Sequence, residues 1–427
     1  ACENCRGHKR MQPALINGQW RPAEAVDSFR AFNPTTGNER SDVWPISGAC
    51  DIDAALTAAV SAAIELRSIP DAQRALFLER YASRLEKRTH DLVKAAHEET
   101  GLPVSPRLAD VEMPRMLDQL MQAAQATREG TWRMAMIDTA KNIRSAAFGL
   151  GPVLVFPPAN FPFAYGCLTG GDFASAIAAG NPVLAKAHPG HPSVSLIAAE
   201  EAVSALNEAG LPPATVQLLH GIPADEGLRL VADSRVGAIG FTGSQHAGMQ
   251  LFAAASAAGN VMWVEMGSVN PVVLLPEAIE ERGDHIAKEL VASVTGSSGQ
   301  VCIKPGIVFL VDDQAGKNFV RCIEKEFQSL DPQVLLNPPG RDRLFTNIHT
   351  LQEAGAVQIV GNNLEGYISS GPCLSIPTLL TATGDTFLAD PNALLVEAFG
   401  NATLLVRCDS LEELIQCVPH IHGSLAA

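Results

Sequence analysis

Residues 236–244 read Val-Gly-Ala-Ile-Gly-Phe-Thr-Gly-Ser, an apolar run that passes directly into glycine and hydroxyl side chains. The run predicts a buried strand, and the residues that follow it, to about 258, predict a helix. Similar strand-like runs lie at 153–156, 182–186, 216–219 and 261–264, and helix-like segments lie between them at 172–179, 193–210 and 224–233. This alternation predicts a mostly parallel sheet with helices on both faces and ligands at the carboxyl ends of its strands.

The regions on either side of this alternation have different patterns. Before it, Asn17-Gly18 between apolar residues predicts a hairpin, and helices are expected to about residue 128, one of them capped by Asp71. After it, a second α/β stretch begins near residue 267, with a helix at 285–294, a strand at 307–311 and helices at 316–327 and 410–417. Ser193 is expected to cap the helix at 193–210. The fold class is therefore α/β, with at least two domains.

Composition excludes several classes of function. The chain has 427 residues, 47% of them apolar, and a net charge of −15, which argues against a nucleic-acid partner. Residues 145–171 carry no charge and are long enough to cross a bilayer, but four prolines in this stretch predict buried strand and loop instead. No membrane partner is therefore expected.

Nine cysteines are spread thinly through the chain, which predicts reduced thiols and a cytoplasmic protein rather than a disulfide scaffold. Cys2, Cys5 and His8 have metal-like spacing, but no second ligand cluster follows them, so no metal site is expected. His188 and His191, separated by Pro189 and Gly190, are interpreted as loop residues.

Two residues have the character of a catalytic nucleophile and a base. Cys302 follows Thr-Gly-Ser-Ser-Gly-Gln-Val at 295–301, where small residues allow a ligand to approach the backbone closely. From this context alone, a nucleophile and a small core cysteine remain equally open. Glu265 ends the strand at 261–264, and a buried carboxylate there would suit a general base, although a salt-bridged end residue is an equal alternative.

Three further polar groups lie at expected loop positions of the first sheet. Asn160, between prolines at 157–158 and 162, would donate to developing negative charge or simply form a turn. Residues 240–248, Gly-Phe-Thr-Gly-Ser-x-x-x-Gly, would bind a diphosphate at a helix start, unless Thr242 or Ser244 only caps that helix. Lys186 ends a strand at the same edge and would meet ribose or phosphate, or remain solvated.

Together, Pro-Ala-Asn-Phe-Pro, Phe-Thr-Gly-Ser, Val-Glu-Met-Gly-Ser-Val-Asn-Pro and Gly-Gln-Val-Cys occur in this order, and from about Leu15 onward the chain resembles the aldehyde dehydrogenase superfamily. Residues 267–271 and 302–306 look most like the 2-oxoglutarate semialdehyde (2,5-dioxopentanoate) dehydrogenases, a group allied to NADP-using fatty aldehyde dehydrogenases. The resemblance implies a cofactor-binding domain at 1–266, an oligomerisation hairpin at about 128–145, and a catalytic domain at 267–427. It implies a homodimer or homotetramer.

The resemblance also implies residue roles. Cys302 would attack the aldehyde, Asn160 and the Cys302 N–H would hold the oxyanion, and Glu265 would activate water for hydrolysis of the thioacyl enzyme. Glu397 would bind the nicotinamide ribose. The other implied cofactor contacts are Lys186, Ser244, Gly243, Phe156, Pro158, Met266, Gly267 and Phe399. The implied substrate-pocket walls are Phe163, Cys167 and Ile303.

The sequence departs from the family at several places. Pro189 replaces a glutamate that accepts hydrogen bonds from the adenosine ribose, so we expect the cofactor to be NADP or NAD, with NADP tolerated. Pro158 replaces a common tryptophan, and Asn401 replaces a common proline. Relatives usually continue for many tens of residues, so the resemblance predicts that the usual C-terminal end of the catalytic domain is missing here.

Four alternatives remain open at this point. A long-chain or other aldehyde would keep the same chemistry with a different pocket. Transfer of the thioacyl group to coenzyme A or phosphate is disfavoured by Glu265, which serves hydrolysis. An inactive structural relative would have an unreactive Cys302. A cysteine hydrolase is disfavoured because no motif places a histidine as the partner of Cys302.

Overall fold

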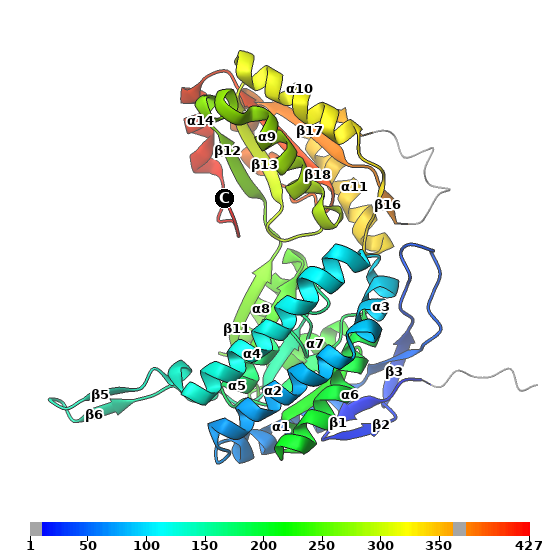
Figure 1. Ribbon diagram of the computed structural model, residues 1–427, viewed down its shortest axis with the longest axis vertical. Helices are drawn as coiled ribbons and strands as arrows, with labels where there is room; N and C mark the ends of the chain where they lie inside the picture. The colour runs from blue at the N-terminus through cyan, green and yellow to red at the C-terminus, as the bar shows by residue number, and fades with distance from the viewer. Residues whose placement is uncertain (1–10, 362–372) are drawn as a thin grey trace, which may run out of the picture. The chain divides into compact units, whose positions relative to one another are not determined.

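The computed structural model describes residues 11–361 and 373–427, and it divides the chain into two compact units (Figure 1). The first unit comprises the chain to Asn33 and Asn38–Met266; the second comprises Pro34–Gly37 and Gly267–Ala427. The candidate site Cys2/Cys5/His8 lies outside the described residues.

The first unit is built on a mostly parallel sheet. The strands of the first unit are β1 (Ala14–Ile16), β2 (Gln19–Arg21), β3 (Ala25–Phe29), β4 (Trp44–Ser47), β5 (Met136–Asp138), β6 (Ile143–Ser145), β7 (Val153–Phe156), β8 (Val183–Lys186), β9 (Val216–Leu219), β10 (Ala238–Gly243) and β11 (Val261–Met266). Of these, β3 pairs with β4 and β5 with β6 in separate two-stranded sheets. Its helices are α1 (Ala49–Leu66), α2 (Asp71–Lys87), α3 (Thr89–Thr100), α4 (Met113–Glu129), α5 (Gly171–Ala178), α6 (Pro192–Ala209), α7 (Ala224–Val231) and α8 (Gln245–Ala257), with a π-helical segment at Val104–Glu112.

The strand order of this sheet is β11-β10-β7-β8-β9-β1-β2. Strands β7 to β11 run parallel, as the strand–helix alternation predicts, and the antiparallel hairpin β1–β2 completes the edge. Asn17 and Gly18 both have positive φ, 52° and 71°, which is the backbone conformation that an Asn-Gly hairpin turn requires. The parallel strands bring the ends of β8, β10 and β11, and with them Lys186, Gly243 and Glu265, to one edge of the sheet.

Helices cover both faces of the sheet. Buried side chains of β7, β8 and β10, including Leu154, Leu184 and Ile239, form one core with Ile52 and Leu56 of α1. Helices α5 and α6 contact β7 to β9, and α2 packs between α4 and α6. The near-continuous apolar runs of the sequence therefore reflect strands that are buried on both sides.

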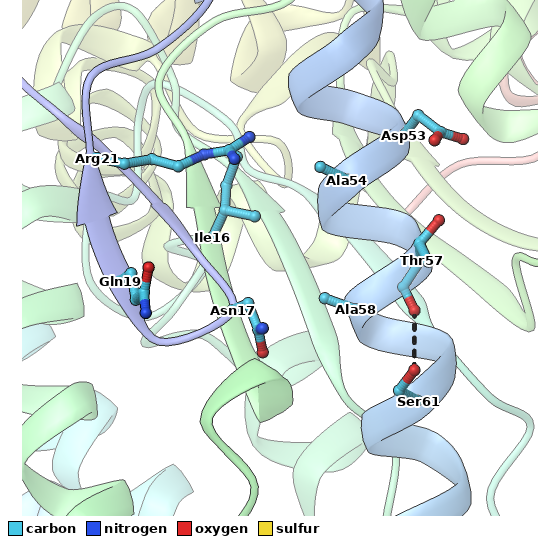
Figure 2. A pocket seen from close by; sticks show the side chains of 9 residues that line it. All are labelled: Ile16, Asn17, Gln19, Arg21, Asp53, Ala54, Thr57, Ala58 and Ser61. Atoms are coloured by element: carbon cyan, nitrogen blue, oxygen red, sulfur yellow. Dashed lines mark hydrogen bonds between the residues drawn. The ribbon is translucent and has the colours of Figure 1, made fainter.

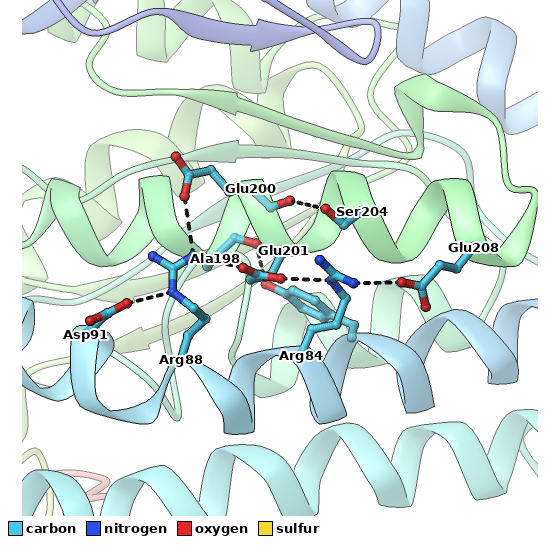
Figure 3. A network of polar contacts seen from close by, with 9 residues as sticks. Arg84, Arg88, Asp91, Ala198, Glu200, Glu201, Ser204 and Glu208 are labelled. Carbon is cyan, nitrogen blue, oxygen red and sulfur yellow. Dashed lines mark hydrogen bonds and ion pairs between the residues drawn. The ribbon is translucent and has the colours of Figure 1, made fainter.

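A buried carboxylate joins α2 to α6. Glu201 of α6 accepts from Arg84 Nε at 2.8 Å and from Arg88 Nη1 at 2.8 Å, and Figure 3 shows it lying between the two guanidinium groups. Arg84 also pairs with the more exposed Glu208 at 2.7 Å. Glu201 is thus the shared acceptor that fixes the two helices against each other.

We expect Glu201→Gln to lower the free energy of unfolding of the first unit by about 1–2 kcal/mol, because both guanidinium groups lose a charged partner at a mostly desolvated position. Glu208→Gln is the matched control and should change it by less than about 0.5 kcal/mol, since that pair is solvent-screened. Urea unfolding followed by tryptophan fluorescence measures both, because all four tryptophans lie in the first unit. Equal midpoints for the two variants would contradict the assignment.

A two-stranded hairpin projects from the first unit. Strands β5 and β6 pair antiparallel, and Figure 1 shows them extending beyond the end of α4, away from the rest of the unit. The large apolar side chains Met134, Met136, Ile137 and Ile143 are 51–78% exposed there. Several large exposed apolar side chains on one projecting hairpin are typical of a contact with another chain.

The second unit is a smaller α/β layer. Its strands are β12 (Asn270–Leu274), β13 (Pro305–Val311), β14 (Gln333–Val334), β15 (Val357–Val360), β16 (Leu374–Ser375), β17 (Thr378–Thr383) and β18 (Ala402–Cys408). Its helices are α9 (Pro276–Thr295), α10 (Gln314–Gln328), α11 (Pro338–Glu353), α12 (Gly384–Ala389), α13 (Pro391–Leu394) and α14 (Leu411–Cys417). The main sheet has the order β12-β13-β18-β17-β15, parallel except for β15.

Alternate residues of β13 supply the cores on the two faces of this sheet. Ile307 and Phe309 belong to the core shared with α11, α12 and α14, whereas Val308 and Leu310 belong to the core shared with α9 and α10. Successive side chains of a strand point to opposite faces of the sheet, so β13 contributes to both cores and lies at the centre of the unit. Cys302 lies three residues before this central strand.

The structure corrects two expected helix caps. Asp71 is the first residue of α2 rather than its cap, and it pairs with Arg74 at 2.6 Å and Arg133 at 2.8 Å. Ser193 lies inside α6, which begins at Pro192, because its N–H and hydroxyl are both taken by Glu99, at 3.1 and 2.6 Å. In each case the expected capping residue is engaged by a distant charged side chain, Arg133 for Asp71 and Glu99 for Ser193.

The uncharged stretch at 145–171 forms β7 and loop, as expected from its prolines. No helix in the described parts of the chain, 11–361 and 373–427, has the length and apolarity needed to cross a membrane.

Candidate functional site

The segment before Cys302 is held in an unusual backbone conformation. Ser297, Ser298 and Gly299 all have positive φ, 52°, 57° and 68°. A Cβ on Gly299 would run into the carbonyl of Gly400, so the two chain segments touch backbone to backbone. Gly299 therefore lets the segment leading to Cys302 pack directly against the one that follows Glu397.

Side-chain hydrogen bonds fix the same segment on both sides of the thiol. Gln300 is buried, and its Oε1 accepts from the Leu336 N–H at 2.9 Å. The Asn270 amide donates to the carbonyl of Cys302 at 2.8 Å and to that of Lys304 at 2.9 Å. Cys302 itself is half-buried, and the Asn270 amide holds it through its carbonyl.

Glu397 lies beside this segment in the second unit. Its Oε1 accepts from the Ser268 N–H at 3.2 Å, and its backbone carbonyl accepts from Asn347 of α11 at 2.8 Å. Gly267 has no side chain where the Glu397 carboxylate packs, and a Cβ there would overlap it. Burial raises the pKa of Glu397, while the Ser268 N–H and the charges of Lys304 and Arg343 counter that shift.

Lys304 is a buried cation two residues beyond the thiol. It is 4% exposed, and its Nζ donates to the Ala402 carbonyl at 2.5 Å. Burial lowers its pKa to about 8, and the negative charge of Glu397 partly offsets this effect. The sequence reasoning missed Lys304, although an ionisable residue just before a fully apolar strand was a signal that could have found it.

In the first unit, the Asn160 loop is held by a buried ion pair. Asn160 is 7% exposed, and its carbonyl accepts from Arg107 Nη2 at 2.9 Å. Arg107 pairs with Glu112, whose carboxylate also accepts from the N–H groups of Phe163 and Ala164 at 2.8 and 3.0 Å. These contacts fix the loop on both sides of Pro162, and neither Arg107 nor Glu112 was predicted.

Glu265 lies near a second carboxylate. It is half-buried at the end of β11, in register with Thr242 of β10. Asp172, on the first turn of α5, packs against Gly240, where a Cβ would lie only 2.6 Å from its Oδ2. Burial raises the pKa of Asp172, and the charge of Glu265 raises it further.

The predicted cofactor residues of the first unit lie at the carboxyl ends of its strands. Lys186 ends β8 and is half-buried, and burial lowers its pKa. His188 and His191 follow in a loop, where their rings stack at 5.3 Å, and burial drives the pKa of His188 well below its usual value. They are loop residues here, and no group of three metal-ligating side chains occurs anywhere in the described chain.

The start of α8 is the segment for which the sequence offered helix capping and diphosphate binding as alternatives. Ser244 caps the helix by accepting from the Ala247 N–H at 3.4 Å, so its capping role is observed. The exposed Gln245 and His246 precede the first intrahelical bond, from Gly248 to Ser244, so their N–H groups remain suited to an anion. Within the first unit, Lys186 at the end of β8 and the start of α8 after β10 both lie at the carboxyl ends of parallel strands.

The remaining predicted residues differ in accessibility. Phe156 and Pro158 are buried, and Met266, Gly267 and Phe399 are half-buried. Ile303 is 55% exposed, but Phe163 and Cys167 are 0% and 1% exposed. Burial also raises the pKa of Cys167 to about 11.

A separate groove of about 450 Å³ lies between the β1–β2 hairpin and α1. Figure 2 shows its lining, which includes Asn17, Gln19 and Arg21 on one side and Asp53, Thr57 and Ser61 on the other. None of the predicted catalytic or cofactor residues lines it.

The chain folds into two α/β units, the first of them built on a mostly parallel sheet. Residues 20–427 match the model of the aldehyde dehydrogenase family. Alpha-ketoglutaric semialdehyde dehydrogenase 2 of Azospirillum brasilense is 35% identical over 97% of this chain and 80% of its own length. Alpha-ketoglutaric semialdehyde dehydrogenase of Acinetobacter baylyi is 32% identical over 97% of this chain and 79% of its own length.

Solved structures show the same fold. An aldehyde dehydrogenase from Bartonella henselae superposes with a TM-score of 0.83 at 19% identity, covering 96% of this chain and 85% of that one. An NAD-dependent benzaldehyde dehydrogenase from Corynebacterium glutamicum superposes with a TM-score of 0.80 at 21% identity, covering 97% of this chain and 88% of that one.

The chain belongs to the aldehyde dehydrogenase family. It is an oxidoreductase that oxidises aldehydes with a nicotinamide cofactor, NAD or NADP.

Proposed function

We propose that the chain oxidises 2-oxoglutarate semialdehyde to 2-oxoglutarate, with Cys302 as the nucleophile. Removal of the thiol proton allows sulfur to form a C–S bond with the aldehyde carbon, and the Asn160 amide and the Cys302 N–H stabilise the resulting oxyanion. The bound nicotinamide supplies the hydride acceptor. Glu265 then takes a proton from water, whose oxygen replaces sulfur on the acyl carbon, and the thiol is regenerated.

The arrangement around Cys302 supports this role. Asn270 donates to the carbonyls of Cys302 and Lys304, and Gln300 accepts from the Leu336 N–H, so side-chain hydrogen bonds fix the segment around the thiol. Cys167 is a poorer nucleophile, because burial keeps its thiol protonated. Glu397 would accept from the nicotinamide ribose, and Lys186 and the start of α8 would hold the adenosine end and the diphosphate.

The proposed substrate class rests on the position of Arg115. It is exposed on α4, its Nη2 lies 3.2 Å from the Tyr165 hydroxyl, and its guanidinium lies 6.0 Å from the ring centre of Phe161, the residue after Asn160. A dicarboxylic semialdehyde needs a cation for its far carboxylate, and guanidinium binds carboxylate well. The two relatives named above as alpha-ketoglutaric semialdehyde dehydrogenases support the same class.

The proposal is tested with 2,5-dioxopentanoate, succinate semialdehyde, an uncharged five-carbon aldehyde and a long-chain aldehyde. We expect 2,5-dioxopentanoate to have the highest kcat/KM, and Arg115→Met to lower that value by about 10- to 100-fold while affecting the uncharged aldehyde little. Arg128→Met, on the same helix and paired with Glu79, is the matched control. A preference for the long-chain aldehyde would overturn the substrate assignment.

For the cofactor, we propose that NADP is accepted alongside NAD. Pro189 leaves no carboxylate at this position of the β8 loop to repel a 2′-phosphate, and Lys186 supplies positive charge nearby. His188 adds a neutral ring rather than a charge, since its pKa is so low. The same substrate panel run with both cofactors tests this, and a preference for NAD of several orders of magnitude would exclude it.

For assembly, we propose a homodimer or homotetramer formed in part through the β5–β6 hairpin. Its exposed Met136, Ile137 and Ile143 would be covered by a second copy.

A further inference from the structure

We propose that Lys304 is a positioning residue that keeps Glu397 ionised and in place for the nicotinamide ribose. The inference rests on the proposed role of Glu397, and it gives a role to Lys304, which lies in the segment 302–306 but was assigned none by the resemblance. All the contacts that carry it lie within the second unit.

The first step is the position of the ammonium group. Lys304 is 4% exposed, and its Nζ donates to the carbonyl of Ala402, the first residue of β18. A lysine this deeply buried is costly unless it serves a charge or a hydrogen bond nearby. Ala402 follows Glu397 by five residues, so the bond ties Lys304 to the chain segment that carries the carboxylate.

The second step is the shared support of the two segments. Asn270 donates to the carbonyls of Cys302 and Lys304, and its Oδ1 accepts from the Ser268 hydroxyl at 3.0 Å. Ser268 in turn donates its backbone N–H to Glu397. A continuous set of hydrogen bonds therefore runs from the turn holding the thiol to the Glu397 carboxylate.

The third step is the charge that faces Glu397. Lys304 and Arg343 are the cations that favour its ionised form, and the Ser268 N–H adds a hydrogen bond, while burial opposes ionisation. Lys304 is the buried member of this set, where charge interactions are least screened by water. A ribose hydroxyl donates to a carboxylate, and the protonated acid would be a weaker acceptor.

The sign of the pH effect follows from these contacts. Removing the Lys304 charge raises the pKa of Glu397 further, so the carboxylate is lost at a higher pH as the solution is acidified. Cofactor affinity should therefore fall earlier on acidification in a variant without the charge than in the unaltered protein.

The experiment measures the Kd of NADH and NADPH by energy transfer from tryptophan, between pH 5.5 and 9, without turnover. We expect Lys304→Gln, which keeps a donor for Ala402, to weaken binding by about five- to tenfold near pH 6 and by less near pH 8. Lys304→Arg keeps the charge and should restore the profile. Lys317→Met removes an exposed charge of α10 and should leave the Kd unchanged.

The double variant Lys304→Gln/Glu397→Gln makes the test specific. If Lys304 acts through Glu397, it should bind the cofactor no more weakly than Glu397→Gln alone. Additive losses, or a pH-independent loss in Lys304→Gln, would overturn the inference. Failure of Glu397→Gln itself to weaken binding would instead overturn the proposed role of Glu397. Circular dichroism tests whether Lys304→Gln is folded. If it is not, Lys304→Met is the second variant without the charge, and its fold is checked in the same way.

Discussion

Replacing Cys302 with alanine is expected to lower kcat for aldehyde oxidation by at least about a thousandfold, because no other group forms the C–S bond to the aldehyde. The fold should be unaffected, since Asn270 contacts the carbonyl of Cys302 and not its sulfur. Binding of NAD(P)H should remain within about twofold of the unaltered protein, which a fluorescence titration measures. Steady-state production of NAD(P)H measures the loss of turnover.

Cys322 supplies the matched control for this variant. It is also half-buried and in the second unit, on α10, so Cys322→Ala should leave turnover unchanged. Brief treatment with iodoacetamide should modify Cys302 and abolish activity. Turnover within tenfold of normal in Cys302→Ala, or an unreactive Cys302, would contradict the assignment and favour an inactive relative.

Replacing Glu265 with glutamine is expected to leave the first turnover intact and to slow the following ones by about 100- to 1000-fold. The carboxylate is needed only to activate water against the thioacyl enzyme, and glutamine has the same shape without the basic oxygen. Stopped-flow measurement should therefore show a burst of one NAD(P)H per active site followed by a slow phase. Glu200→Gln, an exposed carboxylate of the first unit, serves as the control.

This prediction also separates hydrolysis from acyl transfer. In the unaltered protein, full turnover should proceed with neither coenzyme A nor phosphate present. A strict requirement for either acceptor would show that the thioacyl group leaves by another route. Loss of the burst itself in Glu265→Gln would place the carboxylate in the first half of the reaction and contradict its proposed role.

Much of the fold could be predicted because it depends on local patterns. The alternation of apolar strands and helices from 153 to 264 corresponds to β7 to β11, and Asn17-Gly18 forms the predicted hairpin. Boundaries were less accurate where a distant side chain competed with a local one, as Glu99 does at Ser193 and Arg133 does at Asp71. Periodicity contains no information about such partners.

The motifs identified the family and the candidate residues, but they did not reveal how those residues are held. Gly299 was expected only to be permissive, yet it makes a backbone contact with Gly400, about a hundred positions later. Asn401, noted as a departure from the usual proline, is fully buried and joins Ser375 at 2.8 Å and Gln333 at 3.0 Å. Its amide uses both a donor and an acceptor, which proline does not offer.

The strand–helix alternation from 153 to 264 and the family were determined by the sequence alone, and its motifs nominated Cys302 and Glu265 as nucleophile and base, because each of these depends on residues that are neighbours along the chain. The tertiary structure alone decided that Lys304 is a buried cation bonded to the Ala402 carbonyl, that Asn270 braces the turn at Cys302, and that Arg107 and Glu112 fix the Asn160 loop. These contacts join residues far apart in the sequence, and the burial that gives them their strength exists only once the chain has folded.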